Sequence, residues 1–166
     1  MISSHRGHQR CLLRLGLALL RRLLKRRVLV DMLHTKEILE EACTALYIAA
    51  FMGHAGCVKM LLKARAGINV ATSSGRTPLG EASFLGHAEV ARLLLDAAAD
   101  VDQAMENGDT PLYLASHEGH APVVRLLCNA GADVKKAMDD GATPLFAASQ
   151  KGHAPVVRLL CDAGAG

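Results

Sequence analysis

The sequence repeats itself every 33 residues, and this period constrains the fold more than any other feature. Self-similarity at a fixed spacing of about 20–50 residues indicates a solenoid or another repeat array. The chain from about residue 41 is therefore predicted to form four units, 41–73, 74–106, 107–139 and 140–166. The recurring positions are Thr44, Thr77, Thr110 and Thr143; Leu46, Leu79, Leu112 and Leu145; Ala49, Ala82, Ala115 and Ala148; Gly53, Gly86, Gly119 and Gly152; and His54, His87, His120 and His153.

Each unit carries the start and stop signals of two short helices. Thr110-Pro111 is a favoured helix start, and Gly119 is expected to end that helix. Pro122 can open a second helix, and Gly131 is suited to its left-handed C-cap. The sequence therefore predicts an all-α solenoid of antiparallel helix pairs. Tight hairpin-like turns are expected between units at the pairs Ser74-Gly75, Asn107-Gly108 and Asp140-Gly141.

Composition supports a globular array built on small apolar side chains. Hydrophobic residues make up 51% of the chain and charged residues 21%, but aromatic residues only 3%. The core must therefore consist mainly of Leu, Val and Ala. The five cysteines have no paired spacing, which argues against a secreted disulfide framework. We expect a reducing, cytoplasmic location.

Three segments resemble the ankyrin repeat, whose units read T-P-L-H-x-A-A-x-x-G-H-x-x-V-V-x-x-L-L. They are TPLGEASFLGHAEVARLLL (77–95), TPLYLASHEGHAPVVRLLC (110–128) and TPLFAASQKGHAPVVRLLC (143–161), with a weaker match at TALYIAAFMGHAGCVKMLL (44–62). The resemblance implies stacked helix pairs with projecting hairpins, and a role in binding other proteins.

The chain departs from that pattern at two kinds of position. The His that follows Thr-Pro-Leu in the family is replaced by Tyr47, Gly80, Tyr113 and Phe146. Arg65 and Ala98 stand where Gly131 and Gly164 cap the second helices of the later units. Since only glycine adopts a left-handed cap without strain, the first two of these turns should be strained or differently shaped.

No pattern of catalytic or metal-binding residues stands out. The His of the four Gly-His pairs would be about 8–10 Å apart in stacked helices, too far to share one zinc ion. We therefore expect them to bond to backbone atoms. Cys57, Cys128 and Cys161 replace Val or Leu of other units and are expected to be small buried hydrophobes. The sequence thus predicts neither an enzyme nor a cofactor or metal site.

Residues 1–36 form a separate, basic N-terminal extension before the array of 37–166. They hold nine Lys or Arg and one acid, which gives +8, whereas residues 37–166 hold ten and fifteen, which gives −5. On a helical wheel this segment predicts a basic amphipathic helix. A mitochondrial or plastid transit peptide, a membrane-surface helix over residues 10–27 and an extension packed on the first unit all fit this pattern. Nucleic-acid binding is disfavoured because the basic residues lack interleaved aromatics.

The two C-terminal units differ mainly on one side of their first helix. Residues 110–133 and 143–166 are identical at 18 of 24 positions, and four of the six differences lie at i, i+1, i+4 and i+5 of that helix. In the family that helix and the hairpin tips line the concave, partner-binding surface. The predicted contact residues are Phe51, Met52, Phe84, Leu85, Tyr113, His117, Glu118, Gln150 and Lys151.

The leading hypothesis is a non-catalytic scaffold that binds another protein on this concave surface. One alternative is an adaptor directed to an organelle or a membrane surface by residues 1–36, and another is a regulatory fragment of a larger protein. The last unit keeps the apolar set of an internal unit, Val156, Val157, Leu159 and Leu160. Because terminal repeats normally carry a polar outer face, we expect further repeats, a partner or self-association to cover this end.

Overall fold

The computed structural model describes residues 44–165, and this range forms eight helices and no strand. The predicted helix within residues 1–36 lies outside the described residues. The helices form antiparallel pairs, which confirms the predicted all-α solenoid. The first helices of the pairs are α2 (Ala45–Phe51), α4 (Pro78–Phe84), α6 (Pro111–Glu118) and α8 (Pro144–Lys151), and the second helices are α3 (Ala55–Lys63), α5 (Ala88–Asp96), α7 (Ala121–Asn129) and α9 (Ala154–Asp162). Within 44–165 no helix has the length and apolar character needed to cross a membrane.

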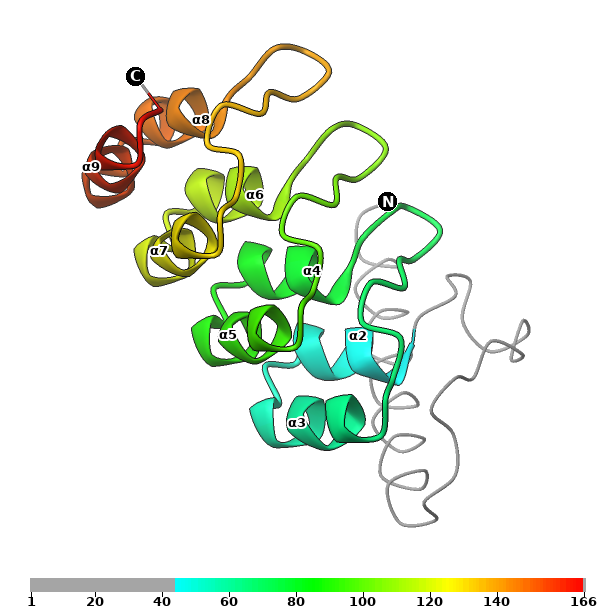
Figure 1. The fold of residues 1–166 in the computed structure, drawn as a ribbon. Coiled ribbons are helices and arrows are strands. Elements are labelled where there is room, and N and C mark those ends of the chain that lie inside the picture. Colours follow the sequence, from blue (N-terminus) through cyan, green and yellow to red (C-terminus); the bar gives the residue numbers. More distant parts are fainter. Residues whose placement is uncertain (1–43, 166) are drawn as a thin grey trace, which may run out of the picture.

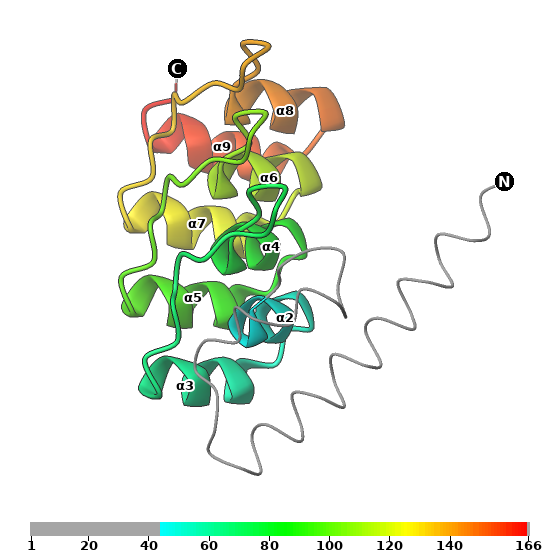
Figure 2. The same ribbon diagram turned by 90° about the vertical axis from the view of Figure 1, so that its right-hand side faces the viewer.

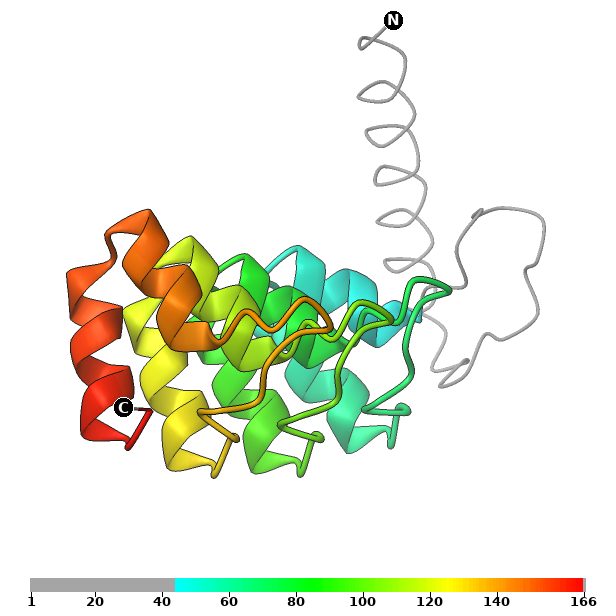
Figure 3. The ribbon, with the colours of Figure 1, turned by 90° about the horizontal axis from the view of Figure 1, so that it is seen from above.

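The helix pairs stack in chain order. Each first helix contacts the first helix of the next unit, and each second helix contacts the next second helix. Figure 1 shows the stack running from α2 and α3 to α8 and α9, with a hairpin projecting between consecutive units. The first helices form one layer and the second helices the other (Figure 2), and the hairpins all extend to the same side (Figure 3). The first helices and the hairpins therefore form one continuous face.

Threonine begins the first helix of every unit because its hydroxyl caps the helix. Thr44, Thr77, Thr110 and Thr143 have extended backbone, and each Oγ1 accepts a hydrogen bond from the N–H three residues on, at 3.0–3.2 Å. Proline follows the threonine in α4, α6 and α8, where no N–H is needed. Such caps stabilise a helix by about 1 kcal/mol each.

The Gly-His pairs link consecutive units. Nε2 of His87, His120 and His153 donates to a carbonyl oxygen at the end of the preceding first helix, at 3.1, 3.0 and 3.0 Å. The predicted backbone-bonding role of histidine is thus confirmed for these three. The imidazole also explains why glycine stands at the end of α4 and of α6. A Cβ at Gly86 or Gly119 would lie only 2.6 Å from the histidine ring of the following unit.

The core repeats with the same period. Leucines of the first helices and valines and leucines of the second helices interlock between units, as the composition predicts. The largest fully buried apolar side chains are Leu46, Leu79, Leu112, Val58, Val90, Val123, Val124, Val156, Leu94, Leu127 and Leu160. Because each unit buries its apolar stripe against its neighbours, the stability of one unit depends on the next.

The turns after α3 and α5 keep the left-handed conformation despite lacking glycine. Arg65 has φ 59° and Ala98 φ 64°, the region that Gly131 occupies at φ 87° and Gly164 at φ 90°. Of the two expected outcomes, strain is therefore the one observed, and the turn shape is retained.

Ala98→Gly should therefore stabilise the protein. Relief of the left-handed strain outweighs the added flexibility of the unfolded chain, so the free energy of unfolding should rise by roughly 0.5–1 kcal/mol. Urea denaturation measures this change. Ala97→Gly is the matched control, because Ala97 has φ −92° and gains nothing from glycine. Equal effects at the two positions would contradict the strain.

Candidate interaction surface

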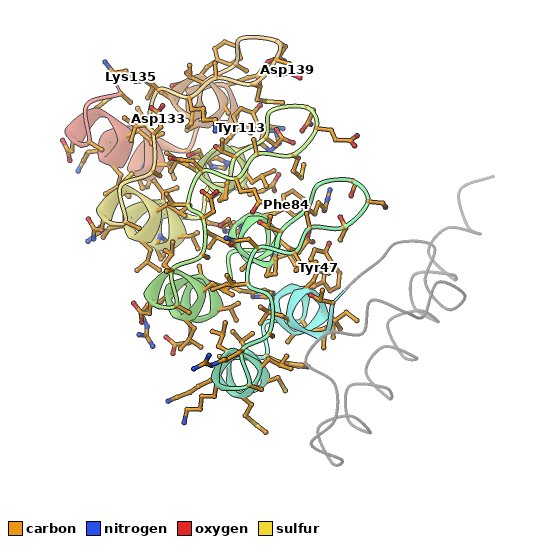
Figure 4. All side chains as sticks on the ribbon, turned by 45° about the vertical axis from the view of Figure 1, so that its right-hand side comes forward. Tyr47, Phe84, Tyr113, Asp133, Lys135 and Asp139 are labelled. Carbon is orange, nitrogen blue, oxygen red and sulfur yellow. The ribbon has the colours of Figure 1, made fainter. Side chains whose placement is uncertain are left out.

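The predicted contact residues lie in rows along the first helices. One row, at the same position of each unit, is Phe51, Phe84, His117 and Gln150, and the adjacent row is Met52, Leu85, Glu118 and Lys151. Tyr113 lies one turn before His117 on α6. Glu118, Gln150 and Lys151 are exposed, and the others are half-buried. Figure 4 shows Tyr47, Phe84 and Tyr113 in sequence along the stack. The structure brings these residues onto one face, and their contact with a partner stays a prediction.

Three hairpins border this face. They are closed by backbone hydrogen bonds from Thr72 N to Arg76 O, from Met105 N to Asp109 O and from Met138 N to Ala142 O, at 2.9, 3.0 and 2.9 Å. The glycines at their tips, Gly75, Gly108 and Gly141, have φ of 79–85°. The predicted hairpin-like turns are therefore confirmed. We call residues 72–76, 105–109 and 138–142 the first, second and third hairpins.

Charge changes sign between the first hairpin and the second. The first hairpin carries Arg76, the second carries Glu106 and Asp109, and the third carries Asp139 and Asp140. The predicted contact residues on the first helices change along the stack from apolar, in units 1 and 2, to polar, in units 3 and 4, and the hairpins beside them change from basic to acidic.

A buried ionic cluster, which was not predicted from the sequence, connects units 1 and 2 at this face. The Glu81 carboxylate is 2% exposed, and its Oε2 accepts from the Tyr47 hydroxyl at 3.0 Å and from Arg76 Nη1 at 3.0 Å. The Arg76 guanidinium carbon lies 5.7 Å from the ring centroid of Phe84. Burial alone would lower the pKa of Arg76, but the Glu81 carboxylate overcomes this effect and raises it. We call Tyr47, Arg76, Glu81 and Phe84 the Arg76 cluster.

The signal for this cluster is a single acidic residue inside an apolar helix. Glu81 follows Leu79 and Gly80 on α4, and it lies 34 residues after Tyr47. Phe84 is predicted to be an apolar contact for a partner, but part of its ring faces the chain's own guanidinium.

A second polar cluster lies on α6. The rings of Tyr113 and His117 stack with centroids 6.2 Å apart, and His117 Nδ1 lies 2.7 Å from Glu118 Oε1. Burial raises the pKa of Tyr113, and so do the carboxylates of Asp109 and Asp140.

The cysteines differ in exposure. Cys57 and Cys128 are half-buried, whereas Cys161 is exposed, and all three are free. The prediction that Cys161 is a buried hydrophobe is wrong, because no helix pair of the described chain packs on the outer side of α9. Burial raises the pKa of the Cys128 thiol. Among residues 44–165, no group of three or more His, Cys, Asp or Glu side chains is placed to hold a metal ion.

The fourth unit leaves apolar groups at the surface. Phe146 is 57% exposed, and a shallow hollow lies over α8 and α9, lined by Ser149, Gly152, Ala154, Val157 and Arg158. The predicted self-association through this unit stays a prediction.

Comparison with known sequences agrees with the fold. A family model of ankyrin repeats, which spans three copies of the repeat, matches residues 8–105 and 98–166. No curated protein matches the chain at a significant level. The matched segments cover well over half of the chain and include all eight described helices.

Proposed function

The chain belongs to the ankyrin repeat family, and from this premise we propose that it is a non-catalytic scaffold that binds a partner protein on one face. That face consists of the first helices and the three hairpins. Ankyrin repeats generally mediate protein–protein interactions. The fold and the family thus support binding as the role, and the face is our assignment.

The observation that carries the assignment is where units 3 and 4 differ. The second helices α7 and α9 share APVVRLLC and differ only in their last residue, Asn129 or Asp162. The first helices instead differ at four positions, which are Tyr113/Phe146, Leu114/Ala147, His117/Gln150 and Glu118/Lys151. At the last two, Glu118, Gln150 and Lys151 are exposed and His117 is half-buried. The second helices are therefore almost unchanged, whereas the differences gather on the first helices and include exposed positions; the one buried change is Ala147 in place of Leu114. This distribution supports specificity on the first helices.

A capture experiment with the full chain tests the assignment. His117, Glu118, Gln150 and Lys151 are changed together to alanine, and proteins bound to the tagged chain in its source cells are quantified by mass spectrometry. We expect at least a tenfold loss of the specifically bound partner, because several contacts are removed at once.

The control variant changes an equal number of exposed residues on the second helices, namely Arg125, Asn129, Arg158 and Asp162. This variant should capture the partner as the unaltered chain does. Both variants must retain the helical circular dichroism of the parent. Equal capture by the two variants would refute the assignment to the first helices.

A further inference from the structure

Consecutive units are joined in the same way three times in the described chain. In each joint, Nε2 of a histidine donates to the carbonyl oxygen of the residue 36 positions earlier, at 3.0–3.1 Å. The histidine ring also packs against the glycine 34 positions earlier, as the ring of His87 does against Gly53. A joint therefore has two halves. The later unit supplies a histidine, and the earlier unit supplies a glycine beside an acceptor carbonyl.

The outer side of unit 4 carries the earlier half of such a joint. A Cβ built on Gly152 would meet nothing within 4 Å. Ser149 is exposed, whereas the serines at the equivalent positions of units 2 and 3 are fully buried. Val157 is only half-buried, whereas Val58 at the equivalent position of unit 1 is fully buried. These positions are therefore covered by the unit that follows, and no described unit follows unit 4.

The outer side of unit 1 carries the later half. His54 is exposed, and its side chain makes no hydrogen bond within residues 44–165. Met60 is 55% exposed, whereas the leucines at the equivalent positions of the three later units are half-buried. Leu159 keeps this cover in unit 4, so the position is covered by the preceding unit. The described stack thus ends in α2 and α3 with one half of a joint and in α8 and α9 with the other (Figure 1).

The sequence before unit 1 lacks the glycine that this joint needs. In the 33-residue register, Leu20 stands 34 positions before His54. At the three equivalent glycines, a Cβ would lie 2.6–2.8 Å from the histidine ring of the next unit. A leucine in this place would therefore collide with an imidazole seated as in the other joints. A second copy of the chain offers Gly152 instead.

Charge favours the same pairing. Residues 1–36, which precede unit 1, hold nine Lys or Arg and one acid. The third hairpin, which leads into α8, carries Asp139 and Asp140. If unit 1 of one copy stacks on unit 4 of another, the basic extension of the first copy is attached beside this acidic hairpin. Opposite charges of this kind speed the encounter of two surfaces and orient them.

We propose that unit 4 binds unit 1 of a second copy of the chain, head to tail, through a fourth joint of the same kind. His54 of one copy donates to the carbonyl oxygen of Gln150 of the other, and its ring packs against Gly152. Met60 and Val157 are covered by the contact. Because each bound copy leaves the same two ends free, the contact is heterologous and leads to open-ended assembly. The first helices and hairpins of successive copies then form one longer face.

Sedimentation velocity with the full chain tests the proposal. Over a concentration series of about a hundredfold, up to about 300 μM, the average mass should rise beyond that of two chains. Val157→Arg and Met60→Arg should each weaken association at least tenfold, because each places an unpaired charge in the joint. His54→Ala should weaken it about fivefold, because one hydrogen bond is lost. Asn129→Arg, the control, adds the same charge at an exposed position of α7 and should change association less than about twofold.

The decisive measurement mixes the two arginine variants of the joint. Val157→Arg leaves unit 1 intact, and Met60→Arg leaves unit 4 intact. Each variant should therefore be monomeric alone, whereas an equimolar mixture should form a dimer that cannot grow, because only one intact joint is available. All variants must retain the helical circular dichroism of the parent.

Four outcomes would overturn the proposal. The full chain could stay monomeric over the whole series, or the mixture of arginine variants could stay monomeric. Met60→Arg could still dimerise alone, which would mean that two copies meet unit 4 to unit 4. Asn129→Arg could lose as much association as Val157→Arg, which would indicate general charge repulsion. The substituted residues lie outside the first helices, so partner capture by the first-helix face is tested independently of this contact.

Discussion

Glu81→Ala is expected to lower the free energy of unfolding by about 3 kcal/mol. The side chain is 2% exposed and supplies the acceptor for both Tyr47 and Arg76. Its removal leaves the Tyr47 hydroxyl, in a residue that is 8% exposed, without this acceptor and opens a cavity between α2 and α4. Arg76 can turn toward water because its side chain is 39% exposed, so it contributes less to the cost.

Denaturation by urea, monitored by circular dichroism, measures this loss. Glu89→Ala is the matched control, because Glu89 also pairs with an arginine, Arg92, at 2.7 Å, but lies at the surface of α5 with 60% of its side chain exposed. The control should leave the unfolding midpoint unchanged, since exposed ion pairs are screened by water. A midpoint shift for Glu81→Ala no larger than that of the control would contradict a structural role for the Arg76 cluster.

Replacing the cluster with apolar side chains of similar size should recover part of the lost free energy of unfolding. Glu81→Leu together with Tyr47→Phe and Arg76→Met removes every polar group of the cluster and keeps most of its volume. Buried ion pairs replaced by apolar groups of similar size often cost little stability. We expect this triple variant to be more stable than Glu81→Ala. The cluster would then serve to fix the register of units 1 and 2 and to occupy their seam.

The repeat period accounts for what the sequence could predict. Each role within a unit or between neighbours recurs every 33 residues, as it does for Thr110, Gly119, His120 and Gly131. A structure predicted for one unit therefore applies to the others. Helix pairs, caps, hairpins and inter-unit histidine bonds followed from this. The periodic part of the molecule is thus encoded locally and redundantly.

The features that the sequence did not reveal lie where the period is broken. Tyr47, Arg76 and Glu81 have no counterpart set in any other described unit, and their contacts cross from one unit to the next. Because glutamate is rarely buried, a glutamate in a predicted helix is normally expected to be exposed to solvent. Pairing such residues requires the relative placement of α2, α4 and the first hairpin, which only the folded stack supplies.

Identical sequence segments can also differ in burial. Cys128 and Cys161 end the same eight-residue segment, but α9 packs against α7, which leaves Cys128 half-buried, and Cys161 has no such neighbour among the described helices. Local sequence thus determines the helix, and the neighbouring unit determines the burial of its outer side chains. The same dependence on neighbours makes two chemically identical substitutions at equivalent glycines differ in cost.

Gly119→Ala is expected to lower the free energy of unfolding by roughly 2–4 kcal/mol, whereas Gly152→Ala should cost only about 1 kcal/mol. Both glycines end a first helix in the left-handed region, at φ 80° and φ 77°. A Cβ at Gly119 would lie 2.6 Å from Nδ1 of His153, but a Cβ at Gly152 would meet nothing within 4 Å. Backbone strain is therefore common to both variants, whereas only Gly119→Ala also collides with the His153 ring.

The collision should act through the hydrogen bond between units. His153 Nε2 donates to the carbonyl oxygen of His117 at 3.0 Å, so a ring displaced by the new methyl group must lengthen or lose this bond. Urea denaturation gives the cost, and hydrogen exchange should show lost protection at the start of α9 in Gly119→Ala alone. Adding His153→Ala to each variant separates the two effects. In that background the extra cost of Gly119→Ala should fall to that of Gly152→Ala, because only strain is left; an unchanged difference would show that the imidazole is not its cause.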